Sequence, residues 1–558
     1  MLLPSVEVLA TPEAPVWAFV LGIMLHVFFL RVGEWDLATV RLIVGFWATI
    51  AGLSVCLWLR VPQLQHNLWS SSKTAIALGS SLLAGMYASM LVYRAAFHRL
   101  GRFPGPFAAR LSNLWITGKS IQRQDKCLVI QDLHRKYGDI VRIGPSELSI
   151  VHAAAPEAIH ANRTTCVKGP WYNILYPLES LQMIRNKDVH SVRRKTWDRA
   201  FGSKALRDYE PRVKGYTAAL VQQIDARLGQ PVNVTEWFNN YSFDVMSDLA
   251  FGKSFGLLAS GGKRHYFTET LHADMGNVGR FSHVPWLFPV FKAMPVLNAE
   301  NKKFWAFVTA LVDERIQNPP KQPDVFSWLL EDYQALPHPT AQDRLNLQAD
   351  AHLICVAGSD TTAASLTCLF FELVCHPDAA ARLQAEIDDY YAGTPEAGQN
   401  HLALSKLEYL QACIDEALRL HPAVPGGVQR LTAPQGLQIG EHHIPGSTVV
   451  QIPTHTINRD ARFFAEPDEF IPERWTSRKD LAIEPSVFVP FSTGRYSCVG
   501  RQLGLMELRT VTSELMRRYD FRLVPGQDPQ DFARGKVDAF TLACAPLQVV
   551  FTPREQAK

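Results

Sequence analysis

The stretch Pro490–Gly500, PFSTGRYSCVG, places one cysteine, Cys498, among two glycines, an arginine and a tyrosine. The chain has nine cysteines, and none lies near Cys498 or forms a C-x-x-C pair. A local disulfide or zinc site at Cys498 is therefore excluded. The residues that follow, VGRQLGLMELRTVTSELMRR, repeat apolar side chains at helical spacing, so a helix is expected to begin just beyond the cysteine.

Two interpretations of Cys498 compete. An isolated cysteine is most often a buried structural residue. The start of a helix, however, supplies free N–H groups and partial positive charge, which lower the pKa of a nearby thiol. Gly494 and Gly500 would permit a tight turn and the close approach of a flat ligand. These flanking features favour a metal-bound thiolate.

Composition limits the function classes. Of the 558 residues, 47% are hydrophobic and 20% are charged, and the net charge is only +3. This balance argues against a nucleic-acid partner, because no dense run of Lys and Arg is present. An odd number of scattered cysteines indicates reduced thiols in a protein that faces the cytosol.

Much of the apolar content lies in three N-terminal runs, at about 16–30, 42–59 and 75–93. A bilayer core requires roughly 20 apolar residues per helix, so we expect two to three transmembrane helices. We predict that residues 1–100 form a membrane anchor and residues 101–558 a catalytic domain. Four arginines follow the third run, which places the domain in the cytosol by the positive-inside rule: Arg94, Arg99, Arg102 and Arg110.

The rest of the chain predicts a mainly α fold with small β-sheets. Residues 139–151, DIVRIGPSELSIV, indicate two short strands around a Gly-Pro turn, and residues 437–453 indicate another strand pair. Long amphipathic helical patterns fill much of 190–420.

The cysteine stretch resembles the haem-binding loop of the cytochrome P450 family, Phe-x-x-Gly-x-Arg-x-Cys-x-Gly. Phe491, Gly494, Cys498 and Gly500 match this pattern, whereas Tyr496 stands where the family has arginine. The resemblance implies a cytochrome P450 fold and a haem (iron protoporphyrin IX) whose axial ligand is the Cys498 thiolate. It also places Tyr496 near a haem propionate, where its hydroxyl can donate a hydrogen bond.

A second resemblance lies upstream, in IDEALRLHPAVP and FIPERW. On the family pattern, Glu416, Arg419 and Arg474 form a buried ion network that braces the haem side of the core. Glu416 and Arg419 by themselves are an ordinary i,i+3 helix pair. Their order and spacing ahead of the cysteine loop favour the network.

A third resemblance is ICVAGSDTTAASL, residues 354–366, in which Gly358 interrupts a helical pattern. It is similar to the family's oxygen-activation groove. The resemblance implies that Thr361 hydrogen-bonds the oxygen being activated and that Asp360 relays protons. The alternative is a packed polar kink, because threonine hydroxyls also bond back to helix carbonyls.

Three basic residues match positions that contact haem propionates in the family. His190 and Arg194 stand one helical turn apart in HSVRRKTWDRAFG, and Arg430 lies in GGVQRLTAP. A solvated basic helix face would produce His190 and Arg194 equally well.

The resemblance implies a monooxygenase that inserts one oxygen atom from O2 into a lipophilic small molecule. We expect a fungal secondary-metabolite intermediate of polyketide, terpenoid or alkaloid type. Electrons would come from NADPH–cytochrome P450 reductase at the endoplasmic reticulum membrane, because the chain shows no nucleotide-binding motif of its own. Fatty-acid or xenobiotic hydroxylation is the alternative within the class, and an isomerase or dehydratase of the same fold is the alternative without net oxygenation.

Overall fold

The computed structural model describes residues 6–64, 67–261, 265–320, 322–395 and 399–554. The chain divides into two compact units. The first comprises residues 1–115, 142–146 and 283–300, and the second comprises the remainder.

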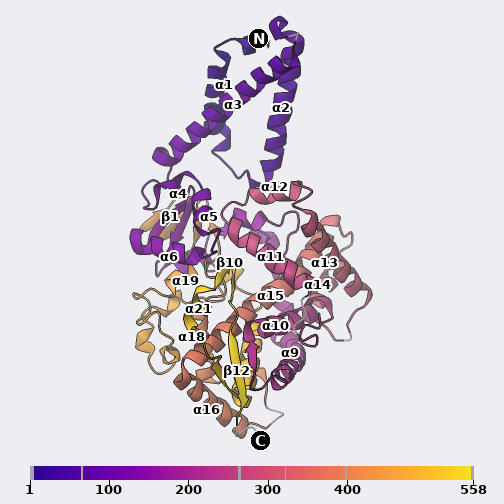
Figure 1. Ribbon diagram of the computed structural model, residues 1–558, viewed down its shortest axis with the longest axis vertical. Helices are drawn as coiled ribbons and strands as arrows, with labels where there is room; N and C mark the ends of the chain where they lie inside the picture. Colours follow the sequence, from indigo (N-terminus) through magenta and orange to yellow (C-terminus); the bar gives the residue numbers. More distant parts are fainter. Residues whose placement is uncertain (1–5, 65–66, 262–264, 321, 396–398, 555–558) are drawn as a thin grey trace. The chain divides into compact units, whose positions relative to one another are not determined.

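The first unit is built on three apolar helices (Figure 1). They are α1 (Ala14–Leu25), α2 (Thr39–Arg60) and α3 (Leu68–Val92). Five-residue π-helical turns extend α1 to Leu30 and α3 to Phe97. The short helices α4 (Phe107–Leu111) and α12 (Leu287–Ala293) belong to the same unit, and α12 packs against α2.

Helices α1 and α3 approach backbone to backbone at two glycines. A Cβ atom added to Gly22 would lie 2.0 Å from the carbonyl oxygen of Leu82, and one added to Gly85 would meet the backbone of α1 equally closely. Further along both helices, His26 Nδ1 and Ser89 Oγ share a hydrogen bond of 2.8 Å. The two helices therefore run in the same direction. Small residues at such a crossing are typical of membrane helix pairs.

The predicted apolar runs all fall within helices that are longer than the runs. Asp36–Arg60 and Leu68–Phe97 are long and apolar enough to cross a membrane, with 17% and 22% of their most apolar window buried. Ala14–Leu30 is a shorter apolar helix. A further apolar helix, Ala341–Cys375, has 78% of its most apolar window buried and lies inside the second unit.

The second unit is mainly helical. Its longer helices are α6 (Lys126–Tyr137), α8 (Lys187–Ala200), α9 (Ser203–Asp225), α10 (Val234–Phe251), α11 (Tyr266–Phe281), α13 (Ala299–Gln317), α14 (Val325–Gln334), α15 (Ala341–Cys375), α16 (Pro377–Gly393), α18 (Glu408–Leu420) and α20 (Arg501–Arg518).

Helix α15 lies at the centre of this unit, because α10, α14, α16, α18 and α20 all pack on it. It begins with a capping box, in which Thr340 and Asp343 satisfy each other's backbone N–H groups. A Cβ at Gly358 would lie 2.4 Å from the terminal methyl of Met246 on α10. The glycine thus allows these two helices to approach closely, and α15 continues as helix through it.

Small sheets complete the fold. β2 (Glu147–Ile150) pairs in parallel with β8 (Val449–Gln451), which pairs antiparallel with β5 (Arg430–Leu431). β5 pairs in turn with β3 (Val167–Lys168), so that Lys168 lies opposite Arg430. The other sheets are β4 (Pro231–Asn233) with β12 (Gln548–Pro553) and β9 (Tyr519–Leu523), β10 (Val537–Ala539) with β11 (Thr541–Ala543), and β6 (Leu437–Ile439) with β7 (His442–Ile444).

The predicted fold class, mainly α with small sheets, is confirmed. The two strands expected in 139–151 are β1 (Ile140–Gly144) and β2, and the pair expected in 437–453 is β6 with β7. The remaining strand of that second stretch, β8, joins the larger sheet instead.

Candidate functional site

The cysteine loop is held in a tight turn just before α20. The backbone N–H of Cys498 donates to the carbonyl of Phe491 at 2.9 Å. Gly494 has φ +70°, and a Cβ there would lie 2.2 Å from the carbonyl oxygen of His160. This position therefore requires glycine. Gly500 has φ −81° and room for a Cβ, so the backbone of the turn does not require glycine there. The expected close approach of a flat ligand at Gly500 stays a prediction.

Helix α20 begins at Arg501, three residues after Cys498, as the sequence predicted. Burial raises the pKa of the Cys498 thiol, while the backbone amides of Gly500 and Arg501 hydrogen-bond the sulfur and lower it by less. The net direction of the pKa shift is upward. A coordinated metal ion would stabilise the thiolate form.

One face of the buried helix α15 remains accessible near this loop. Ala357 is exposed and Thr361 is half-buried, although Asp360 and Thr362 beside them are buried. The hydroxyl of Thr361 donates to the carbonyl of Ala357 at 2.7 Å. Helix α20 packs on α15 here, since a Cβ at Gly504 would lie 3.8 Å from Thr362 Oγ1. The stretch 354–366 thus lies against the first turn of α20, just after Cys498.

A cluster of basic groups surrounds Tyr496. The ring of His190 meets that of Tyr496 edge-on at 4.8 Å. Lys168 Nζ and the guanidinium of Arg430 lie 4.9 and 5.0 Å from the centre of the same tyrosine ring. Burial, followed by the charge of Lys168, lowers the pKa of His190 to about 3. His190 is therefore neutral at physiological pH.

Arg194 holds the cysteine loop. Its guanidinium donates to the carbonyl of Ser497 at 2.8 Å and pairs with Asp198 at 2.8 Å. Arg430 is anchored differently, because it donates to the hydroxyl of Tyr172 at 2.9 Å. Two of the three basic residues expected at this site therefore also have partners in the protein.

Glu416, Arg419 and Arg474 form one buried ion network. Arg419 binds the Glu416 carboxylate with two hydrogen bonds of 2.9 and 2.8 Å, and Arg474 donates a third at 3.2 Å. All three side chains are completely buried. Backbone carbonyls accept three further hydrogen bonds from each guanidinium, which offsets the unmatched positive charge.

Comparison with known proteins identifies the family. The sequence matches the family described as Cytochrome P450 over residues 109–551. This chain belongs to the cytochrome P450 family. It is 52% identical over 537 residues to cytochrome P450 monooxygenase FCK2 of Fusarium pseudograminearum, covering 96% of this chain and 97% of that one. It is 36% identical to tryprostatin B 6-hydroxylase of Aspergillus fumigatus, over 96% of both chains.

A solved structure supports the fold. The haem domain of cytochrome P450DA is similar with a TM-score of 0.66 at 18% identity, covering 79% of this chain and 96% of that one. The predicted family, fold and haem cofactor are confirmed, as is the class of enzyme, a P450 monooxygenase.

The residues of the site fit a haem-thiolate cofactor. Cys498 is exposed, and backbone amides at the start of α20 hydrogen-bond its sulfur. On the basic side, the part of the chain that the structure describes offers no hydrogen-bond partner to three buried polar atoms: Tyr496 Oη, Arg430 Nε and His190 Nδ1. Buried polar atoms normally have partners, and the two carboxylates of a haem would supply them here.

Lys168 is a member of this site that the sequence did not reveal. Its ammonium group is buried and donates to the carbonyl of Leu181 at 2.9 Å. Burial, and then the charge of Arg430, lower its pKa well below the usual value. The available signal was weak, because only the strand register places Lys168 opposite Arg430.

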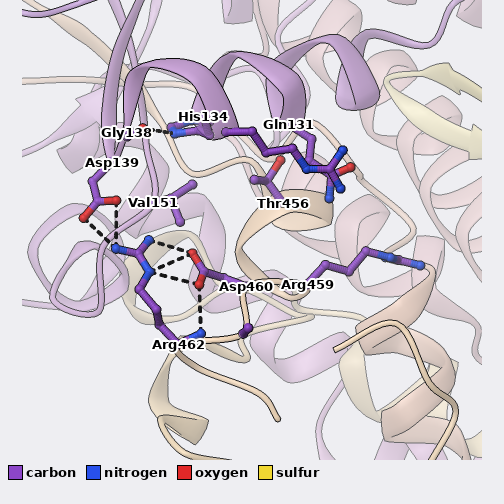
Figure 2. A pocket seen from close by; sticks show the side chains of 11 residues that line it. Gln131, His134, Gly138, Asp139, Val151, Thr456, Arg459, Asp460 and Arg462 are labelled. Atoms are coloured by element: carbon purple, nitrogen blue, oxygen red, sulfur yellow. Dashed lines mark hydrogen bonds and ion pairs between the residues drawn. The ribbon is translucent and has the colours of Figure 1, made fainter. Parts of the chain in front are cut away.

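A separate pocket of about 220 Å³ lies between α6 and residues 456–462 (Figure 2). Its charged groups are paired, since Arg462 binds Asp139 at 2.8 Å and Asp460 at 2.6 Å. The hydrogen bonds to both aspartates raise the pKa of Arg462. This pocket is stabilised by internal ion pairs and shares no residue with the cysteine site.

Proposed function

We propose that this monooxygenase inserts one oxygen atom from O2 into a lipophilic secondary-metabolite intermediate of polyketide, terpenoid or alkaloid type. The observation that carries the proposal is the accessible face of α15 at Ala357 and Thr361, on the helix against which α20 packs just after Cys498. A relative is named as a hydroxylase of tryprostatin B, which supports hydroxylation of such a compound.

Each residue of the site has a proposed role. Cys498 would hold the haem iron, and the bound haem supplies the oxygen-activating chemistry. Tyr496, Arg430, His190 and Lys168 would bind the propionates. Lys168 Nζ lies 4.9 Å from the centre of the Tyr496 ring, so it would be a hydrogen-bond donor near the position where the family has arginine. Arginine and buried lysine are both suited to carboxylate partners. Arg194 would position the loop through Ser497.

The proposed proton path uses Asp360 and Thr361. The Thr361 hydroxyl, which donates to Ala357 in the resting protein, would turn toward the substrate side and donate a proton there. The Asp360 carboxyl group, one residue earlier on α15, would restore that proton. This pair favours oxygenation over an isomerase or dehydratase, since those reactions need no proton delivery to oxygen.

We further propose that α1, α2 and α3 anchor the chain in the endoplasmic reticulum membrane with the catalytic part in the cytosol. The parallel direction of α1 and α3 supports three crossings, and the arginines after α3 support the cytosolic side. Electrons would come from NADPH–cytochrome P450 reductase. The exposed Arg501, at the start of α20, is a candidate contact for it.

The test is co-expression of the full chain with the reductase, followed by feeding candidate intermediates and measuring product mass. A gain of one oxygen atom supports the proposal, and a product of unchanged mass would favour an isomerase. Feeding fatty acids in parallel tests the alternative substrate class.

Thr361→Ala and Thr362→Ala form a matched pair of variants. Thr361→Ala should divert electrons to peroxide and reduce product, because the accessible hydroxyl is removed. Thr362→Ala should retain coupling, since its side chain is buried against α20. Equal behaviour of the two variants would contradict the proposed role of Thr361.

A further inference from the structure

A second pocket, of about 540 Å³, is lined by His272, whose imidazole lies beside Asp360 of α15. Helices α10 and α11 and the segment after β11 line it, mainly with polar side chains: Glu236, Asn239, Asn240, Glu269, His272 and Cys544. Asn240 Nδ2 is buried and has no hydrogen-bond partner within the described ranges. A polar space of this size with unpaired amide atoms is suited to ordered water.

His272 links this pocket to the site. Its Nε2 lies 3.5 Å from Oδ1 of Asp360, and its side chain is 51% exposed whereas that of Asp360 is 8% exposed. The ring of Phe243 packs edge-on against the imidazole at 5.8 Å and orients it. One face of the imidazole therefore meets the pocket and its Nε2 faces the carboxylate.

We propose that His272 passes protons from this pocket to Asp360, so that the pocket is the proton entrance of the enzyme. The inference rests on the proposed role of Asp360 in proton transfer, and it names His272 as the group that supplies protons to Asp360. In each transfer the imidazolium Nε2–H gives its proton to Asp360 Oδ1, which leaves a neutral imidazole. Water in the pocket, acidified from bulk buffer, returns a proton to the ring. The 3.5 Å separation requires a small rotation of the half-exposed ring.

The charges around His272 favour its protonated form. Burial lowers the pKa of His272, but the hydrogen bond and the charge of Asp360 raise it by more, so the net shift is upward. Glu236 on α10 and Glu269 on α11 face the same pocket, and both are acidic. Protonated His272 therefore contributes to stability below its ordinary pKa of 6.5, and this contribution is lost as the pH rises through the raised folded-state pKa.

The first experiment measures the electrostatic coupling between His272 and Asp360 in the absence of catalytic turnover. The haem-loaded full chain, with isotope-labelled histidine in lipid nanodiscs, is titrated by NMR, and the His272 signal is the one that disappears in His272→Gln. Asp360→Asn should lower the pKa of His272, because the hydrogen bond and the charge of Asp360 are what raise it. An unchanged pKa of His272 in Asp360→Asn would overturn the proposal.

The second experiment measures proton delivery with reductase and NADPH. His272→Gln should reduce product per NADPH by about tenfold, increase peroxide, and flatten the fall in rate with rising pH. His442→Gln is the matched control, because His442 also lies beside an acid, Glu441, at 3.8 Å on a remote hairpin. A His272→Gln enzyme with the coupling and pH profile of the control would equally overturn the proposal.

The two experiments also separate this inference from the proposed function. If the wild-type enzyme oxygenates none of the compounds tested, the proposed substrate class fails, yet the coupling of His272 to Asp360 is still decided by the NMR titration. If product forms normally and only the pKa coupling is absent, the proton entrance alone is wrong.

Discussion

Replacement of Glu416 by glutamine tests the buried ion network directly. The Glu416 carboxylate accepts hydrogen bonds from Arg419, from Arg474, from the indole N–H of Trp475 at 3.0 Å and from the backbone N–H of Ile471 at 3.1 Å. Glutamine keeps one acceptor oxygen and turns an NH2 group toward these donors. Two guanidiniums then remain buried without a counter-charge.

The expected cost follows from that geometry. Breaking a fully buried ion pair by removing one partner costs about 3–5 kcal/mol. For residues 109–551, the span of the family match, the unfolding entropy is about 0.9 kcal/mol/K near 60 °C. The thermal midpoint should therefore fall by roughly 3–6 °C. The haem content of the purified protein should fall with it, because the network braces the cysteine side of the core.

The assay is thermal unfolding of the full chain in nanodiscs, followed by tryptophan fluorescence at one scan rate for all variants. Glu314→Gln is the matched control. It makes the same charge change at a half-exposed pair with Lys253, which contributes about 1 kcal/mol at most. If Glu416→Gln unfolds no earlier than Glu314→Gln, the reasoning about stranded charge is refuted.

Three further predictions concern the loop, the basic cluster and the topology. Gly494→Ala should lower the haem-to-protein ratio, because its Cβ would clash with the carbonyl oxygen of His160. Gly526→Ala is the control: it carries a similar backbone strain of about 1–2 kcal/mol at φ +90°, but it has open space around it and should keep its haem. Lys168→Met should raise the pKa of His190 and speed haem loss to a scavenger several-fold; unchanged haem loss would exclude a propionate role. Expression in a eukaryotic host should leave the three N-glycosylation sequons unmodified, at Asn162, Asn233 and Asn240. A glycan on any of them would place the catalytic part in the lumen.

Local patterns predicted much of the fold and part of the site. The helix after Cys498 followed from apolar periodicity, and α15 followed from a long helical pattern that tolerates Gly358. The meeting of Glu416, Arg419 and Arg474 followed from the family resemblance, since spacing alone predicts only the first two as neighbours.

The site residues that the sequence did not reveal depend on tertiary neighbours, which the spacing of residues along the chain does not encode. Lys168 enters the site through the register of β3 on β5, and His272 reaches Asp360 only because α11 lies beside α15. The two glycines of the loop also differ in a way that the sequence did not show: Gly500 has an ordinary φ, so only Gly494 is required by the backbone of the turn. Whether Gly500 makes room for a flat ligand remains a prediction.

The glycine crossing of α1 and α3 has a practical consequence for recombinant work. A shortened protein that begins between α1 and α2 would uncover the backbone of α3 at Gly85, a surface shaped to fit another helix. Such a fragment should self-associate or aggregate in detergent. Removing all three helices together, or none of them, avoids exposing the surface of α3 that α1 covers.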